Sequence, residues 1–143
     1  MKIRLMQIDD YDLVYRLWCT TPGMGMRSLD DSKEGIGRFL VRNPDTCFVA
    51  EYEGEIAGVI LCGHDGRRGY IYHTAVTEYH RNKGIGGALV NAVLEALKQQ
   101  QINKVALVVY STNDLGNHFW SQLGFESRND LTYRNISLNT DNN

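Results

Sequence analysis

A short basic and glycine-rich segment, Arg81–Ala88 (RNKGIGGA), carries the clearest chemical signal in this sequence. It lies between an apolar run that ends at Val76 and a long amphipathic segment that begins near Gly84. The first turn of a helix leaves backbone N–H groups unpaired, and the helix dipole adds partial positive charge there. Glycine lets the backbone approach a bound anion closely because it has no Cβ. The segment therefore predicts a phosphate-binding loop.

Two common phosphate loops do not fit this segment. A Rossmann fingerprint requires a third glycine where Leu89 stands, and the P-loop pattern G-x-x-x-x-G-K-[ST] does not occur in the chain. The formal net charge is only −2, so Arg81 and Lys83 concentrate positive charge locally. A pI near 6.1 gives no indication of nucleic-acid binding.

The length of 143 residues predicts one domain, 1–143, with a polar tail from about residue 139. The cysteines Cys19, Cys47 and Cys62 are odd in number and form no C-x-x-C pair, which predicts reduced thiols rather than a disulfide framework or a zinc site. The four histidines show no metal-ligand spacing, so we expect no metal. No leader-like or membrane-length apolar run is present, and we expect a cytoplasmic protein with no membrane contact.

Apolar periodicity predicts the elements that must position the loop. The expected order is strand, two helices, three strands, helix, strand, helix and two strands. The strands are expected at 3–6, 46–52, 55–63, 70–76, 104–110, 125–128 and 131–138, and the helices between the N-cap Asp9 and the break at Thr20, and at 31–41, 84–99 and 114–123.

The connections between these elements predict the fold class. Short turns with glycine, such as Glu53-Gly54, indicate antiparallel hairpins. Lys104–Tyr110 is nearly continuous in apolar β-formers, as is typical of a strand buried on both faces. We therefore expect an α+β, three-layer fold, with a single mixed, mostly antiparallel sheet and helices on both faces.

Two motifs now carry a resemblance. The loop matches R/Q-x-x-G-x-G/A, and Asn113–Phe125 (NDLGNHFWSQLGF) looks like N-x-x-A-x-x-F-Y-x-x-x-G-F. Together with the element order, they make the chain resemble the GNAT family of N-acetyltransferases from about residue 3 to 138. The resemblance implies a GNAT-like acyl-CoA N-acyltransferase fold, acetyl-CoA as co-substrate, and direct acetyl transfer to a primary amine in a ternary complex. It implies neither a metal nor a covalent enzyme intermediate.

The resemblance also implies where acetyl-CoA binds. In the family, pantetheine fills a gap between the strand that ends here at Val76 and the next strand, Lys104–Tyr110. The Val76 N–H would face the thioester oxygen. The residues implied to bind the cofactor are Ala75, Val76, Arg81, Asn82, Lys83, Gly84, Gly86, Gly87, Asn113 and Trp120.

Trp120 departs from the family pattern. Many relatives carry a tyrosine there that can protonate the departing thiolate, whereas an indole N–H is no usable acid at neutral pH. The resemblance therefore supplies no general acid. Thiols with a pKa of roughly 8–10 leave tolerably well without full protonation, so the reaction remains feasible.

The general base is left open between Tyr72 and His73. Relatives place a base on the face that carries Tyr70, Tyr72 and Thr74 here. Strand alternation puts His73 on the opposite face unless a bulge intervenes. A tyrosine, with an ordinary pKa near 10, is a poor base, so a water relay beside Tyr72 is one option and His73, chemically better, is the other. Alternation favours the first.

The acceptor is expected to be a small-molecule or protein amine, in a pocket that the resemblance places beside Thr20–Arg27 and Asp65–Gly69. A second hypothesis is a catalytically idle module that binds or senses acyl-CoA. A third is a generic nucleotide-binding domain with affinity for ATP or NAD. The sequence leaves a homodimer through the last strands open.

Overall fold

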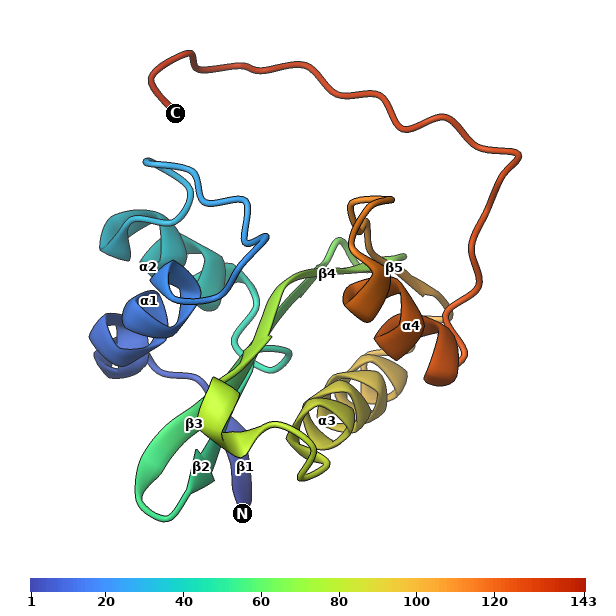
Figure 1. Cartoon of the computed structure of the whole chain (residues 1–143). Coiled ribbons are helices and arrows are strands. Elements are labelled where there is room, and N and C mark those ends of the chain that lie inside the picture. Colours follow the sequence, from blue (N-terminus) through green and yellow to red (C-terminus); the bar gives the residue numbers. More distant parts are fainter.

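The strands lie side by side in the order in which they occur along the chain (Figure 1). The computed structural model describes residues 1–143 and contains a five-stranded sheet of order β1-β2-β3-β4-β5. All neighbours are antiparallel except β4 and β5, which are parallel. The expected mixed, mostly antiparallel sheet is thus confirmed. The strands are β1 Lys2–Leu5, β2 Phe48–Tyr52, β3 Glu55–His64, β4 Gly69–Val76 and β5 Val105–Ala106.

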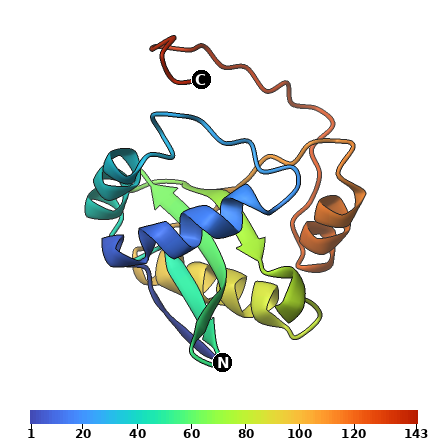
Figure 2. The same cartoon turned by 60° about the vertical axis from the view of Figure 1, so that its left-hand side comes forward.

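Helices cover both faces of the sheet, as Figure 2 shows from a second side. On one face, α1 and α2 bury Val14, Trp18 and Ile36 against the sheet. On the other face, α3 buries Leu89 and Val93, and α4 packs beside it through half-buried aromatic residues. No helix is long and apolar enough to span a bilayer. The helices are α1 Tyr11–Cys19, α2 Lys33–Arg42, α3 Ile85–Gln99 and α4 Asp114–Gln122, with short 3-10 helices η1 Ile8–Asp10 and η2 Glu78–His80.

An ionic cluster fixes the first strand to the first helix. The Arg4 guanidinium contacts both carboxylate oxygens of Asp10 at 2.9 and 2.8 Å and Glu51 on β2 at 2.7 Å. The same Asp10 carboxylate accepts the Gln7 N–H at 2.8 Å. The expectation that Asp9 caps the helix was wrong, because Asp9 lies within η1 and α1 begins two residues later.

A β-bulge in β4 changes which side chains share a face. The register with β3 passes from Cys62↔Ile71 to Ile60↔Thr74, so β4 contains one residue more than β3 over this stretch. The extra residue falls at Tyr72 or His73. Alternation is interrupted there, and two successive side chains point to the same side of the sheet.

The C-terminal part differs from the sequence expectation. The strand expected at 104–110 is only two residues long, and those expected at 125–128 and 131–138 are not formed. The backbone of residues 126–138 makes no hydrogen bond with the rest of the chain. β-Propensity makes this segment extended, but a strand also needs a neighbour to pair with. The segment instead runs from α4 across to the loop between α1 and α2 (Figure 1).

Candidate active site

The strands β4 and β5 separate after a short contact. They pair only at Gly69↔Val105 and Tyr70↔Ala106, so beyond Tyr70 the strand β4 has a partner on its β3 side alone. The Thr77 N–H donates to the Ala57 carbonyl of β3 at 2.8 Å. In an antiparallel ladder, every second residue directs its N–H away from the partner strand. The Val76 N–H therefore points into the gap beside β4.

The candidate phosphate loop, Arg81–Ala88, follows β4 in the chain after the short helix η2. Asn82 and Gly84 adopt left-handed conformations, with φ of 62° and 78°. Glycine accepts such a φ without strain, and asparagine is among the residues that tolerate it best. The Ala88 N–H makes the first intrahelical bond, to the Gly84 carbonyl, at 3.0 Å. The preceding N–H groups of the first turn of α3 have no intrahelical acceptor and are available to an anion.

The two adjacent glycines of this turn have different surroundings. A Cβ on Gly86 would lie 2.9 Å from the ring of Phe119, whereas a Cβ on Gly87 would meet nothing within 4 Å. Gly86 therefore allows α4 to pack closely against α3. Of these two glycines, Gly87 alone faces open space.

The basic side chains of the loop are exposed, and one of them is supported by aromatic rings. The Lys83 Nζ lies 4.7 Å from the centroid of the Tyr52 ring, a cation–π arrangement. Tyr52 in turn contacts the His80 ring at 4.9 Å between centroids. His80 is held by Thr77 through a hydrogen bond of 2.7 Å. Arg81 and Lys83 thus place two positive charges beside the open turn of α3.

The second motif builds α4. The Asn113 side chain accepts the Gly116 N–H at 2.9 Å and so caps the helix. Trp120 is half-buried and stands edge-on to Phe119 and Phe125, with centroid distances of 4.9 and 5.0 Å. In this structure the Trp120 side chain packs α4 through its contacts with Phe119 and Phe125.

The bulge brings the two candidate bases onto one face. The His73 ring meets Trp18 of α1 at 4.9 Å between centroids, and the Tyr72 ring meets Phe39 of α2 at 5.6 Å. The expectation that His73 lies opposite Tyr72 was therefore wrong, because strict alternation does not hold across the extra residue. Thr74 pairs with Ile60, whose side chain belongs to the α3 side, so it does not share the Tyr72 face.

Asp31 holds His73, and sequence reasoning missed this contact. The His73 Nε2 lies 2.8 Å from Asp31 Oδ1, while the Arg27 N–H donates to Asp31 Oδ2 at 2.6 Å. The Asp31 side chain is only 8% exposed. Asp31 was expected to begin a helix, but Ser32 caps α2 instead, which leaves the carboxylate free to face β4. No spacing in the sequence links residues so far apart.

The environment sets the protonation of the neighbouring groups. Burial, together with the nearby Tyr133, raises the pKa of Tyr72, so this phenol keeps its proton at neutral pH. Burial also raises the pKa of Cys47 to about 11 and that of Cys62 to about 12. Neither thiol is a nucleophile at neutral pH, since the thiolate is the reactive form.

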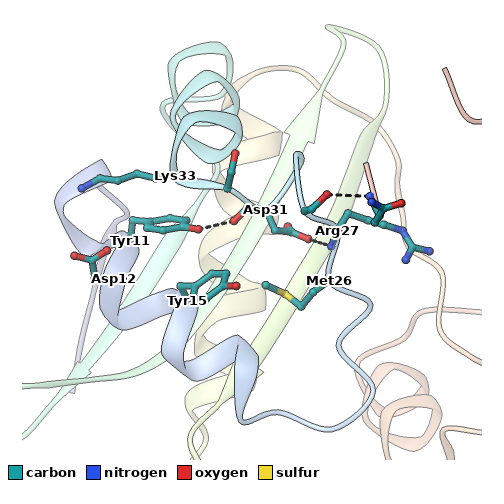
Figure 3. Close-up of a pocket in the computed structure, with 10 residues that line it drawn as sticks. Tyr11, Asp12, Tyr15, Met26, Arg27, Asp31 and Lys33 are labelled. Atoms are coloured by element: carbon teal, nitrogen blue, oxygen red, sulfur yellow. Dashed lines mark hydrogen bonds between the residues drawn. The ribbon is translucent and has the colours of Figure 1, made fainter. Parts of the chain in front are cut away.

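A cavity of about 540 Å³ opens on the α1 side of this site (Figure 3). Met26 and Arg27 of the loop expected to border the acceptor line it, whereas the Asp65–Gly69 turn does not. The Tyr11 hydroxyl donates to the Asp31 carbonyl at 2.6 Å across one wall. The cavity thus reaches the same Asp31 that holds His73. Its full lining is Tyr11, Asp12, Tyr15, Met26, Arg27, Ser28, Asp31, Ser32, Lys33 and Asn143.

Comparisons with known proteins agree with this geometry. The model of the Acetyltransferase (GNAT) family matches residues 11–125. An acetyltransferase of Photorhabdus laumondii is 34% identical over 130 residues, which are 90% of this chain and 88% of the relative.

Two solved structures have the same fold. Ard1 from Thermoplasma volcanium superposes with a TM-score of 0.77 at 26% identity, covering 86% of this chain and 80% of that one. The Mycobacterium tuberculosis protein Rv2747, solved in complex with CoA, superposes with a TM-score of 0.66 at 20% identity, covering 83% and 70%. The chain belongs to the GNAT family of acetyltransferases.

Proposed function

We propose that this protein is an N-acetyltransferase that moves the acetyl group of acetyl-CoA to a primary amine. The observation that carries the proposal is the free edge of β4, which leads directly into the open first turn of α3. An extended pantetheine chain can pair with such an edge as an added strand would. Family membership supports acyl transfer, and the CoA complex of Rv2747 supports CoA as the carrier. The cytoplasm, where thiols stay reduced, is the location we propose.

The proposed donor site uses backbone groups more than side chains. The Val76 backbone faces the gap, so its N–H stabilises the oxyanion that forms on the thioester and its carbonyl accepts from a pantetheine amide. The expected contact of Ala75 with pantetheine is not kept, because the Ala75 backbone faces Val59 of β3. The N–H groups around Gly84, Gly86 and Gly87 bind the pyrophosphate, and Arg81 and Lys83 add charge. Asn82 contributes the turn that precedes α3. Asn113 and Trp120 belong to α4 and shape the side of the proposed donor site that faces this turn.

For the base we propose His73, held by Asp31. If Nε2–H donates to Asp31, then Nδ1 keeps its lone pair and can accept a proton from the acceptor ammonium. The neutral amine then attacks the thioester carbon, the C–S bond breaks as the tetrahedral intermediate collapses, and CoA leaves as a thiolate. The second amine proton passes to solvent. Tyr72 is a weaker candidate, since its raised pKa keeps it protonated.

Calorimetry with acetyl-CoA and a CoA-release assay over a panel of amines test the proposal together. The panel spans polyamines, amino acids, aminoglycosides and peptides with a free amino terminus. Binding with turnover of at least one amine is the expected result. Binding without any turnover would indicate the idle module, whose possibility rests on the tryptophan at position 120. Affinity for ATP or NAD in place of acetyl-CoA would indicate a nucleotide-binding domain.

A further inference from the structure

Three aromatic rings lie together on the α2 side of the sheet, next to His73. The Tyr72 ring meets Phe39 of α2 at 5.6 Å and Tyr70 of β4 at 4.8 Å between centroids. Tyr70 and Phe39 are half-buried, whereas Tyr72 is 54% exposed. We call Phe39, Tyr70 and Tyr72 the aromatic patch. More than half of its central ring is therefore open to a ligand.

The rings around Tyr72 are held by the sheet beneath them. A Cβ on Gly63 of β3 would lie 2.9 Å from the Phe39 ring, so the glycine lets that ring lie directly on β3. Tyr70 pairs with the same Gly63 across the β3–β4 ladder. The positions of Phe39 and Tyr70 are thus set by backbone packing, and Tyr72 stands between them with one side exposed.

A carboxylate near the patch makes its surroundings negative. Burial is the main cause of the raised pKa of Tyr72, and the negative charge of Asp30 adds to it. The Asp30 carboxylate accepts the neutral Asn142 amide at 2.9 Å and forms no ion pair with a basic side chain. The face of an aromatic ring also carries negative potential. Rings and carboxylate together favour a cation over a neutral apolar group.

The patch is adjacent to the proposed base. Tyr72 and His73 follow one another in β4, and the bulge directs both side chains to the side of α1 and α2. Consecutive Cα atoms are about 3.8 Å apart, so one short flexible molecule can contact both side chains. An acceptor whose amine lies at Nδ1 of His73 can therefore place its other end on the Tyr72 ring.

We propose that the aromatic patch binds a second cationic group of the acceptor, so that the enzyme prefers diamines and polyamines to monoamines of the same length. This inference rests on the proposed function, because it concerns the acceptor of that reaction. One amine, in its neutral form, attacks the thioester. The other stays an ammonium ion over the face of Tyr72, close to the Asp30 carboxylate. Tyr72 thus determines specificity and takes no part in proton transfer.

The ratio of kcat/KM for putrescine to that for pentylamine tests the proposal. Pentylamine has the same length, but a methyl group replaces the second ammonium. Per amine group, the wild type is expected to prefer putrescine at least about fivefold. Tyr72→Leu, which keeps apolar bulk but removes the ring, is expected to lose this preference and still turn over pentylamine. Tyr72→Phe keeps the ring and is expected to keep the preference.

Two further variants complete the test. Asp30→Asn keeps the shape of the side chain and is expected to lower the putrescine preference in part, because it removes the charge. Tyr79→Leu is the matched control, since it makes the same change at a tyrosine of η2 that is 92% exposed and lies outside the patch. It is expected to show the wild-type ratio. A wild-type ratio near one, or a ratio that Tyr72→Leu leaves unchanged, would overturn the proposal.

Failure of this proposal and failure of the proposed function give different results. If Tyr72→Leu bound acetyl-CoA but lost turnover of both amines equally, Tyr72 would act in the reaction rather than in specificity, and the proposal would be wrong. If the wild type turned over neither amine, the failure would be that of the proposed function. Calorimetry of putrescine with CoA present would then decide: weaker binding to Tyr72→Leu than to the wild type supports the patch, and equal binding overturns it.

Discussion

At the scale of single residues, the central pair is His73 and Asp31. The bulge turns His73 toward α1, and the buried Asp31 carboxylate fixes its ring at 2.8 Å. The pair links β4, where acyl-CoA is proposed to bind, to the wall of the cavity that Met26 and Arg27 also line. An imidazole oriented through one nitrogen can use the other as a base.

His73→Gln should lower kcat on the order of 100-fold, the lower end of what a general base contributes, without changing the affinity for acetyl-CoA. In the wild type, turnover should rise with pH and then level off, as expected when a side chain of the enzyme is the base, and this plateau should be absent in the variant. Asp31→Asn should lower kcat less and keep the plateau, because the ring is still present but is held less firmly. The measurement is kcat as a function of pH for the wild type and the two variants.

The matched control is Tyr72→Phe. It removes a phenol that stays protonated at neutral pH and should retain the shape of the pH profile. A plateau lost in Tyr72→Phe but kept in His73→Gln would assign the base to the tyrosine instead.

Trp120 should act through packing rather than as an acid. Trp120→Phe should retain much of the activity, because a phenyl ring keeps most contacts with Phe119 and Phe125. Trp120→Ala should reduce the free energy of unfolding by about 2–4 kcal/mol, somewhat less than for a fully buried tryptophan. Urea unfolding and CoA release measure the two effects. A folded but inactive Trp120→Phe that still binds acetyl-CoA would show that the indole N–H takes part in the reaction.

At the scale of elements, Gly86 sets the distance between α3 and α4. The sequence analysis assigned Gly86 and Gly87 alike to the cofactor, but only a Cβ on Gly86 meets Phe119. Gly86→Val should therefore reduce the free energy of unfolding by about 1–3 kcal/mol, the usual cost of overpacking. Gly87→Val, next to it in the same turn, should be almost neutral. Thermal unfolding of both variants checks the contrast, and equal losses would contradict it.

The ionic cluster of β1 and η1 should make stability fall in acid. Hydrogen bonds from the Arg4 guanidinium, followed by the Gln7 N–H, lower the pKa of Asp10. A pKa lowered by folding adds stability above the unfolded value of about 4, and this stability is lost as pH falls through the folded value. Asp10→Asn should cost about 1–3 kcal/mol at neutral pH and much less in acid.

The control for this prediction is Asp12→Asn, which removes an exposed carboxylate from the same part of the chain. Its effect should stay within about 0.5 kcal/mol, as for most surface substitutions. Urea unfolding between neutral and acidic pH is the measurement. If Asp10→Asn and the wild type lost stability in parallel on acidification, Asp10 would not be the group responsible.

At the scale of the whole molecule, local pattern predicted most of the fold. Helical periodicity located α3 to within one residue, and glycine turns predicted the hairpins of β2, β3 and β4. The loop was found because its signal, basic residues and glycines at a helix start, is contiguous. Asp31 and the bulge were not found, since both depend on contacts between distant elements. The strands expected at 125–128 and 131–138 are not formed, because propensity predicts an extended backbone but not its partner.

The binding of acetyl-CoA at the loop is the central claim, and calorimetry on a charge variant tests it most directly. Arg81→Gln/Lys83→Gln should weaken binding at least about tenfold, or about 1.4 kcal/mol, and should reduce its dependence on salt. Lys98→Gln, which removes one exposed charge from the far end of the same helix, should bind as the wild type does. A folded double variant with wild-type affinity and salt dependence would contradict the assignment of the loop.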